Sequence, residues 1–287
     1  MPSQKTYVVT WRRKYSEAAR RLGSELESRR LVEESAVADW PFALDEVVTT
    51  RADRYFESMV ERRAAGEPLQ YVLGRWGFRG LDLFVDRRVL IPRPETEQVV
   101  SVALGALDRR APGSPTVVDL GTGSGAIAIS VAVERPGTAV WATDVSEEAL
   151  AVATANLAGT AGRAAAGVHL VHGSWWSALP SELAGTVDVA VSNPPYISAG
   201  EMGNLDAVVA GWEPRQALEG GPTGLEAIER VIEGAPGWLA PGGALVVEIA
   251  PHQAGTARAL ARTAGFRHVV VHHDLAGRDR VLLAENY

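Results

Sequence analysis

The sequence predicts an α/β protein in which a small N-terminal helical bundle precedes a mostly parallel seven-stranded sheet with an antiparallel last strand. Three observations support this. Strand-like and helix-like segments alternate through the C-terminal two thirds of the chain. Only a short loop joins the last two apolar runs. The stretch from residue 15 to about 66 is charged and glycine-poor, with apolar residues at roughly helical spacing. Three segments follow: a helical domain at 1–66, a connector at 67–97 and a sheet domain at 98–287.

The helical bundle is predicted from apolar residues that recur about once per helical turn: Leu22, Leu26, Val47, Val48, Ala52, Tyr55, Phe56, Met59 and Val60. The residue pattern changes after Pro68, where residues 71–74 and 81–85 resemble the two strands of a short hairpin. This hairpin ends at Ile91-Pro92-Arg93-Pro94. We interpret it as a connector between the two domains.

The sheet domain is predicted to begin with a helix from Thr96 to about residue 106. Apolar, β-branched runs separated by alanine-rich stretches then predict parallel strands at 116–120, 140–144, 168–172, 187–192 and 244–249. The last two runs, 268–272 and 280–283, are joined by a loop too short for a helical crossover. They should therefore pair antiparallel.

Composition excludes several classes of function. The chain has 287 residues, 46% of them hydrophobic, which is enough for a packed core, and it has no cysteine. Disulfides, zinc–thiolate sites and cysteine nucleophiles are therefore excluded. The formal net charge of -7 disfavours a broad positive field for nucleic acid. No apolar run approaches the roughly 18 residues of a membrane span, and no signal-peptide core is visible at the N-terminus, so we expect a cytoplasmic protein.

A glycine-rich turn follows the first predicted strand of the sheet, in the run Asp119-Leu120-Gly121-Thr122-Gly123-Ser124-Gly125-Ala126. Glycines here let the backbone approach a ligand closely. The run also fits the dinucleotide fingerprint, and a tight turn without a ligand is a third interpretation. Asp144 ends the next strand, where its carboxylate can accept hydrogen bonds from both hydroxyls of a ribose. An N-cap role for Asp144 remains an alternative.

The run Asn193-Pro194-Pro195-Tyr196 follows the fourth strand, at the edge where open α/β sheets place ligands. The prolines restrict the backbone and remove N–H donors, so carbonyl oxygens are left as acceptors. The Asn193 side-chain oxygen and the Pro194 carbonyl can together accept both hydrogens of a planar NH₂ group, against the Tyr196 ring. Such a clamp orients a weakly nucleophilic nitrogen for methylation and needs no metal. The alternative is a structural Asn-Pro turn.

Together with the strand layout, these motifs are typical of a Rossmann-like class I methyltransferase, and nearly the whole chain resembles the release-factor glutamine methyltransferases, the HemK/PrmC family. Three stretches carry the resemblance beyond the general motifs. They are Glu67-Pro68-Leu69-Gln70-Tyr71-Val72-Leu73-Gly74, then Leu90-Ile91-Pro92-Arg93-Pro94-Glu95-Thr96-Glu97, and Glu213-Pro214 with Ala217-Leu218 and Gly224-Leu225.

The resemblance implies the substrate, which is the glutamine of the Gly-Gly-Gln motif in class 1 peptide chain release factors. It also implies methylation of the N5 amide nitrogen, S-adenosyl-L-methionine as cofactor, S-adenosyl-L-homocysteine as product, and substrate docking by the helical domain. A monomer without metal, stable nucleic-acid binding or membrane attachment is expected. The implied catalytic residues are Asn193, Pro194 and Tyr196, and the implied substrate-binding residues are these three and Pro195. The implied cofactor residues are Gly121, Thr122, Gly123, Asp144, Ser174, Trp175, Asn193, Arg93 and Thr96.

The sequence departs from the family pattern at one position. An Asp-Trp or Asp-Phe pair is expected after the third strand, but the chain has Gly173-Ser174-Trp175-Trp176. Ser174 can accept a hydrogen bond from the adenine amine without charge, so the departure bears on cofactor affinity. Both tryptophans are interpreted either as flanking the adenine or as core. Arg93 is interpreted either as lining the mouth of the site or as a salt-bridge partner.

Three rival functions remain open. An adenine-N6 DNA or RNA methyltransferase uses the same motif, but it needs a basic groove and a target-recognition segment, which the sequence does not show. A ribosomal-protein glutamine methyltransferase is disfavoured by the run at 93–97, and a non-enzymatic binding module requires a decayed site. The cluster Trp11-Arg12-Arg13-Lys14 indicates a solvated terminus, or contact with ribosomal RNA or an acidic partner.

Overall fold

The computed structural model describes residues 9–110, 113–160 and 162–286. The start of the predicted helical domain, residues 1–8, lies outside this described part. The chain divides into two compact units, Met1–Gly74 and Arg75–Tyr287. The predicted connector at 67–97 is therefore shared between the units, and its hairpin belongs to the second one.

The first unit is a helical bundle, as predicted. Its helices are α1 (Trp11–Leu22), α2 (Glu25–Ser35), a 3-10 turn η1 (Phe42–Asp45), α3 (Thr50–Ala64) and α4 (Leu69–Leu73). The Ser24 hydroxyl caps α2 and the Thr49 hydroxyl caps α3, each accepting a hydrogen bond from a free backbone N–H of the first turn. The apolar faces meet in a core that includes Leu31, Phe56 and Met59.

The tryptophan of the predicted basic terminus is a core residue. Trp11 is 2% exposed and packs edge-on against Phe56, with ring centroids 5.5 Å apart. Lys14, in the same cluster, forms ion pairs with Asp53 and Glu57 of α3. The interpretation of this cluster as a solvated terminus was therefore wrong for Trp11 and Lys14, whereas the Arg12 and Arg13 side chains are exposed, at 59% and 60%.

The strand predicted at 71–74 was also wrong. These residues form α4, which begins after Pro68 and ends at Gly74 with a left-handed φ of 70°. Leu69, Val72 and Leu73 all pack into the core of the helical bundle. A helix places residues at this spacing on one face, whereas a strand would point Val72 away from the other two. The hairpin lies one step later in the chain, where β1 (Arg75–Phe78) pairs with β2 (Leu81–Phe84).

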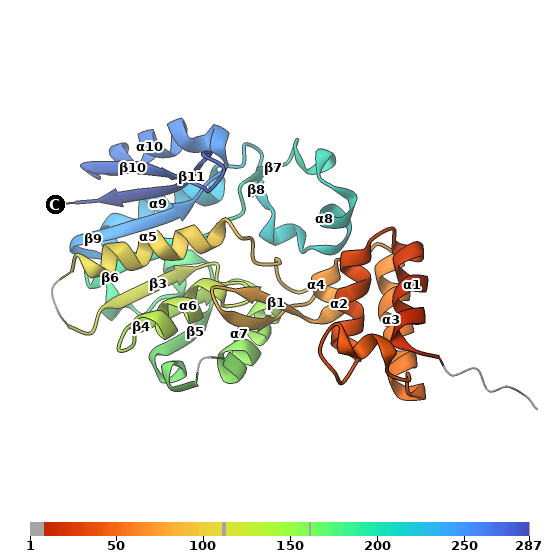
Figure 1. Cartoon of the computed structure of the whole chain (residues 1–287). Helices are drawn as coiled ribbons and strands as arrows, with labels where there is room; N and C mark the ends of the chain where they lie inside the picture. Colours follow the sequence, from red (N-terminus) through yellow and green to blue (C-terminus); the bar gives the residue numbers. More distant parts are fainter. Residues whose placement is uncertain (1–8, 111–112, 161, 287) are drawn as a thin grey trace, which may run out of the picture. The chain divides into compact units, whose positions relative to one another are not determined.

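Within the described residues, the second unit is built on a seven-stranded sheet with the order β10-β11-β9-β6-β3-β4-β5 (Figure 1). Strands β5, β4, β3, β6 and β9 run parallel, and β11 lies antiparallel between β9 and β10. This confirms the predicted class I methyltransferase layout. The strands are β3 (Thr116–Leu120), β4 (Ala139–Asp144), β5 (Val168–His172), β6 (Val187–Ser192), β9 (Leu239–Glu248), β10 (His268–His273) and β11 (Asp279–Glu285).

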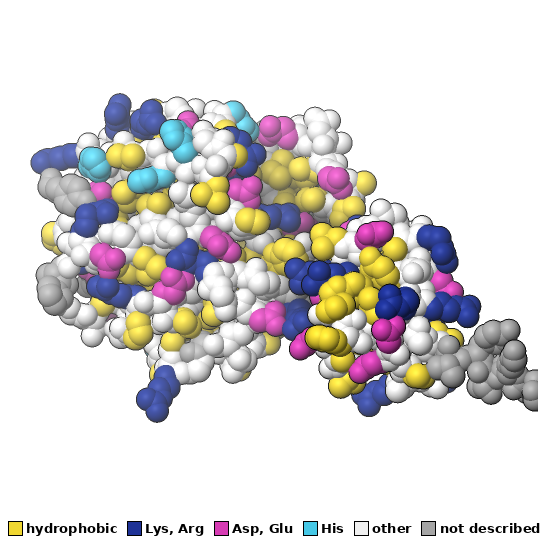
Figure 2. Space-filling model, in the orientation of Figure 1, with side chains coloured by type: hydrophobic (Ala, Val, Ile, Leu, Met, Phe, Trp, Pro, Cys, Tyr) yellow, Lys and Arg dark blue, Asp and Glu magenta, His cyan; other side chains and the backbone are white. Residues whose placement is uncertain are grey.

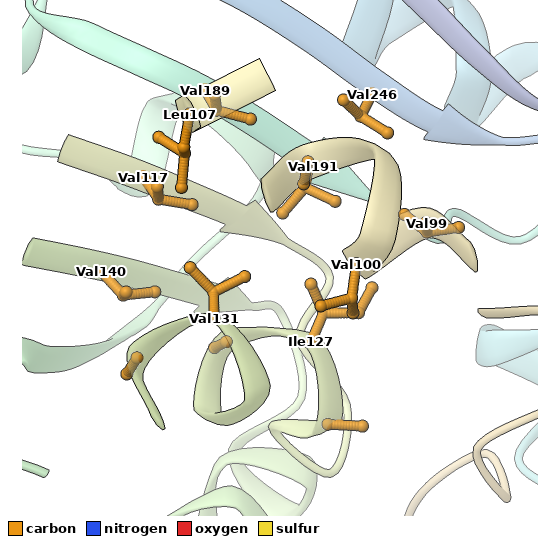
Figure 3. Close-up of a cluster of buried hydrophobic side chains, with 14 of the residues drawn as sticks. Val99, Val100, Leu107, Val117, Ile127, Val131, Val140, Val189, Val191 and Val246 are labelled. Atoms are coloured by element: carbon orange, nitrogen blue, oxygen red, sulfur yellow. The ribbon is translucent and has the colours of Figure 1, made fainter. Parts of the chain in front are cut away.

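Helices cover both faces of the sheet. On one face, α5 (Thr96–Asp108) and α6 (Ala126–Glu134) bury aliphatic side chains against β3, β4, β6 and β9. Figure 3 shows this layer, in which Val100 and Ile127 of the helices lie near Val191 of the sheet. On the other face, α9 (Glu226–Trp238) and α10 (Ala254–Thr263) bury Ile228 and Ala257. The strands are apolar on both faces for this reason.

The remaining elements are short, apart from α7 (Glu147–Thr160), which packs beside β2 and β5. They are η2 (Gly162–Gly167), η3 (Trp175–Ala178), η4 (Ser181–Leu183), β7 (Ile197–Ser198), η5 (Met202–Asn204), α8 (Ala207–Trp212), η6 (Arg215–Ala217), β8 (Glu219–Gly221) and η7 (Pro251–Gln253).

Strand register aligns the carboxyl ends of the central strands. Leu120 of β3 pairs with both Thr143 of β4 and Ser192 of β6, and Ser192 pairs with Val247 of β9. The residues that directly follow these paired positions therefore lie together at one edge of the sheet. They are Gly121, Asp144, Asn193 and Glu248. The order of the strands brings together residues that lie up to 127 positions apart (248 − 121 = 127) in the chain.

Candidate active site

A cavity of about 530 Å³ opens at this edge. It is lined by the loops after β3, β4, β5 and β6, by residues between 88 and 96, by residues between 214 and 222, and by the start of α9. Most of the residues predicted from the sequence line it: Thr96, Gly121, Thr122, Gly123, Asp144, Ser174, Trp175, Asn193 and Pro195. Arg93, Pro194 and Tyr196 are not among the lining residues that the structure describes. The last two adjoin the lining through Asn193 and Pro195.

The glycine-rich turn leaves room for a ligand. Gly121 has a φ of 77°, which favours glycine, and a Cβ there would lie 3.4 Å from the ring of Trp175. A side chain at this position would therefore fill the space between the turn and the indole. Gly123 donates its backbone N–H to Asp144 Oδ2 at 2.8 Å, which joins the first two loops of the site.

Asp144 lies at the junction of these loops. Its Oδ1 accepts the Ser146 backbone N–H at 2.9 Å, while the Ser146 hydroxyl accepts the Ala149 N–H and caps α7. Burial raises the pKa of Asp144, and the backbone N–H groups of Ser146 and Gly123 oppose that rise. Each carboxylate oxygen retains a lone pair for a further donor, so a ribose diol can still bind.

Asp119 stabilises the turn from behind. It is fully buried, and its Oδ2 accepts hydrogen bonds from the Thr122 hydroxyl at 2.7 Å and the Ala128 N–H at 3.2 Å. Burial raises the pKa of Asp119 to about 7. This carboxyl group connects the end of β3 to the start of α6, and it holds the glycine-rich turn in place.

The two tryptophans after β5 have different surroundings. Trp175 lines the cavity beside Ser174 and adopts a positive φ of 48°. Trp176 is 7% exposed, donates its indole N–H to the Val231 carbonyl and stacks on Trp238. Of the two readings left open for this pair, Trp175 has the position of a ligand-flanking ring, and Trp176 is a core residue.

Asn193 is held in one orientation by a buried polar chain. Its Nδ2 donates to Thr96 Oγ1 at 3.1 Å, and the Thr96 hydroxyl donates to Glu248 Oε2 at 2.7 Å. Thr96 and Glu248 are 4% and 1% exposed. Among the described residues, no donor reaches Asn193 Oδ1, so this oxygen is available to a ligand of the cavity.

The backbone after Asn193 is packed closely against a second segment. Strand β7, which follows Tyr196, pairs with β8, and a Cβ at Gly220 of β8 would lie 2.5 Å from the Pro195 carbonyl oxygen. The Tyr196 carbonyl accepts the side-chain amide of Gln253 at 2.9 Å. Burial, followed by the charge of Glu248, raises the pKa of Tyr196 to about 12, so its phenol stays neutral.

Arg93 is placed in a structural ion pair. Its Nη2 lies 2.6 Å from Glu213 Oε1, and the Glu213 side chain is only 2% exposed. Glu213 Oε2 also accepts the Ile91 N–H at 3.3 Å. The pair joins the segment before α5 to the segment after α8, and both segments contribute a proline to the cavity lining, Pro92 and Pro214.

Two buried residues next to the site, Glu248 and Gln253, were not predicted from the sequence. Glu248 is a carboxylate at the end of an otherwise apolar strand, and this isolated charge at the ligand-binding edge was an available signal. Gln253 donates to the carbonyls of Tyr196 and Gly224 at 2.9 and 3.0 Å. A glutamine in a loop carries no comparable signal in the sequence.

Charged side chains of both signs are mixed on the face of the protein that Figure 2 shows. Figure 2 shows Lys and Arg side chains interspersed with Asp and Glu on that face, without a continuous basic groove in the view. Within residues 9–110, 113–160 and 162–286, no cluster of three or more His, Asp or Glu side chains has the geometry of a metal site. In the same residues, no helix has the length and apolarity of a membrane span.

Comparison with known proteins agrees with this geometry. A family model described as the PrmC N-terminal domain matches residues 17–74, and one described as the methyltransferase small domain matches residues 101–210. A release factor glutamine methyltransferase of Bordetella pertussis is 45% identical over 259 residues, covering 89% of this chain and 93% of the relative. The chain belongs to the release factor glutamine methyltransferase family. The resemblance stated from the sequence is thereby confirmed.

A second release factor glutamine methyltransferase, from Moorella thermoacetica, is 41% identical over 287 aligned residues, 96% of this chain and 98% of the relative. Solved structures are more distant. A methyltransferase from Pyrococcus furiosus has a TM-score of 0.51 and 21% identity, covering 82% of this chain and 98% of its own. The hMettl16 catalytic domain, in complex with MAT2A 3'UTR hairpin 6, has a TM-score of 0.55 and 14% identity, covering 89% and 88%. These two show the fold alone. Membership of a methyltransferase family implies use of S-adenosylmethionine.

Proposed function

We propose that this protein transfers a methyl group from S-adenosylmethionine to the side-chain amide nitrogen of the Gly-Gly-Gln glutamine in class 1 peptide chain release factors. The observation that carries the proposal is the orientation of Asn193, whose Nδ2 is tied to Thr96 while it lines the cavity. Oδ1 is then the end left to accept a hydrogen bond from substrate. The relatives named as release factor glutamine methyltransferases support the choice of substrate.

The residues of the cavity fit the proposed cofactor. The turn at Gly121 and Gly123 gives space for a close approach, and Asp144 offers carboxylate lone pairs to the ribose hydroxyls. Trp175 provides an aromatic face next to the turn, and Ser174 provides an uncharged acceptor for the adenine amine. S-adenosylmethionine supplies an electrophilic methyl group carried on a sulfonium.

The loop at Asn193 supplies the substrate half of the reaction. An amide nitrogen is a poor nucleophile because its lone pair is delocalised into the carbonyl group. Asn193 Oδ1 and the Pro194 carbonyl would accept its two hydrogens, which orients the nitrogen and stabilises the positive charge that develops on it. The neutral Tyr196 ring would pack against the planar amide. Metal and strong base are not required for this arrangement.

The proposal predicts one product in a direct assay. A purified class 1 release factor, incubated with the protein and S-adenosylmethionine, is expected to gain the mass of one methyl group, which fragment spectra map to the Gly-Gly-Gln glutamine. A short peptide with the same motif is expected to react more slowly, since it lacks the surface that the helical unit would contact. Methylation of a different residue, or none, would refute the assignment of substrate.

The proposed role of Asp144 predicts a loss of cofactor affinity. Asp144→Ala is expected to weaken S-adenosylhomocysteine binding by about 1.5–3 kcal/mol, the range for hydrogen bonds to a charged group. Titration calorimetry measures this directly, and NAD serves as the control ligand that should release no heat with the parent protein. Asp188→Ala is a matched control, because Asp188 pairs with Arg110 and does not line the cavity. An unchanged dissociation constant for Asp144→Ala would leave Asp144 as a structural residue of the turn.

A further inference from the structure

The polar chain behind Asn193 contains a directional constraint. An asparagine amide has nearly the same shape when its oxygen and nitrogen are exchanged, so packing alone does not select one orientation. The proposed clamp works in one orientation only, with Oδ1 towards the substrate NH₂. Something in the site must therefore distinguish the two.

Glu248 makes that distinction through Thr96. An ionised carboxylate only accepts hydrogen bonds, so the Thr96 hydroxyl has to give its single proton to Glu248 Oε2, as observed at 2.7 Å. The Thr96 oxygen then has only lone pairs to offer, and its neighbour must be the donating Nδ2 of Asn193, as observed at 3.1 Å. The Asn193 oxygen is left pointing away from Thr96.

We propose that Glu248 and Thr96 are positioning residues, and that the negative charge of Glu248 sets which end of the Asn193 amide faces the substrate. This inference rests on the proposed function of Asn193. The inference also makes the orientation of Asn193 reversible with pH, because the direction of a hydrogen-bond chain depends on the protonation of the acid at its end. A neutral Glu248 can donate to Thr96, Thr96 can then donate to Asn193 Oδ1, and Nδ2 would face the substrate amide.

The surroundings of Glu248 place this reversal near neutral pH. Burial is the largest influence and raises the pKa of Glu248 to about 7; the Thr96 hydroxyl lowers it. Three other groups face it: Arg280 of β11 and the Tyr196 hydroxyl lower its pKa, and Glu95 before α5 raises it. The active direction therefore requires a pH above about 7. As pH falls through this value, Glu248 takes up a proton and the clamp is lost.

The test is the pH dependence of single-turnover methyl transfer to release factor, with both substrates saturating. The parent rate constant is expected to be constant above about pH 8 and to fall by about tenfold for each unit below the pKa of Glu248. Glu248→Gln removes the ionisation, so its profile is expected to lose this acidic limb. Thr96→Val breaks the chain without changing the side-chain shape, and we expect a rate about tenfold lower at pH 8 without the limb. Thr96→Ser keeps the hydroxyl and should retain both the rate and the limb.

Thermal melting of each variant shows whether the protein is folded, and cofactor affinity shows whether the cavity that Thr96 and Asn193 line is intact. An acidic limb that persists in Glu248→Gln and Thr96→Val would overturn the inference, as would equal rates for Thr96→Val and Thr96→Ser. Failure of the proposed function gives a different result, because the parent itself would then leave the release factor unmethylated at every pH.

Discussion

Asn193→Ala is expected to lower kcat by about 10²–10³-fold, the magnitude for loss of one preorganised polar partner of a transition state. The hydrogen bond that is lost strengthens as positive charge develops on the substrate nitrogen, so the effect should fall mainly on the chemical step. The dissociation constant for S-adenosylmethionine should change much less. Single-turnover transfer to release factor, with both substrates saturating, measures the chemical step. Transfer at the parent rate would mean that the amide clamp is not the source of catalysis.

Asn193→Asp separates shape from charge at the same position. The aspartate keeps the size of the side chain and one acceptor oxygen, but it adds a negative charge next to the cationic sulfonium. Tighter cofactor binding is expected together with impaired turnover, because the charge stabilises the ground state as well as the transition state. It would also face Thr96 as an acceptor in place of the Nδ2 donor, which removes the hydrogen bond observed at 3.1 Å.

Arg93→Ala is expected to lower the free energy of unfolding by about 2–3 kcal/mol. The substitution leaves the Glu213 carboxylate, which is 2% exposed, with the Ile91 N–H as its remaining partner. Urea unfolding measures the loss. Cofactor affinity should fall as well, because the ion pair joins the two segments that carry Pro92 and Pro214 into the cavity lining.

A double substitution identifies the cause of that loss. If the cost arises from an unpaired buried charge, then Arg93→Ala combined with Glu213→Gln should recover much of the stability, since a neutral amide is cheaper to bury than a carboxylate. Arg93→Lys keeps a positive charge and should cost less than Arg93→Ala. A double variant as unstable as the sum of its two single variants would show that the pair is not coupled.

The sequence alone determined the sheet and the strand ends that carry the site. Valine-rich runs such as Val187–Ser192, in which every residue but Asp188 is buried, place side chains in the core on both faces of a strand, as in a parallel sheet covered by helices. Once the strands are parallel, their carboxyl ends share one edge. Gly121, Asp144 and Asn193 were therefore assigned to one site although they are separated by up to 72 residues (193 − 121 = 72). The sequence pattern was sufficient here because the end of each parallel strand has a known place at the edge of the sheet.

The sequence pattern gave a wrong or open prediction where the two alternative structures of a segment differ only in the tertiary contacts that the segment makes. Residues 69–73 have the apolar content of a strand, and the core of the helical bundle around Val72 decided for a helix. The sequence left two interpretations of Arg93, as a residue at the mouth of the site or as a salt-bridge partner. The tertiary structure decided for the salt bridge, because it brings the buried Glu213 carboxylate, 120 residues further along the chain, next to Arg93.

The polar chain of Asn193, Thr96 and Glu248 depended most on tertiary structure. Thr96 and Glu248 are 152 residues apart in the chain, and their hydrogen bond exists because α5 packs across the ends of β6 and β9. The sequence determined that an asparagine lies at the ligand-binding edge. Which way its amide faces is a property of the buried groups that surround it, because hydrogen-bond direction is set by the donors and acceptors that the fold brings within about 3 Å.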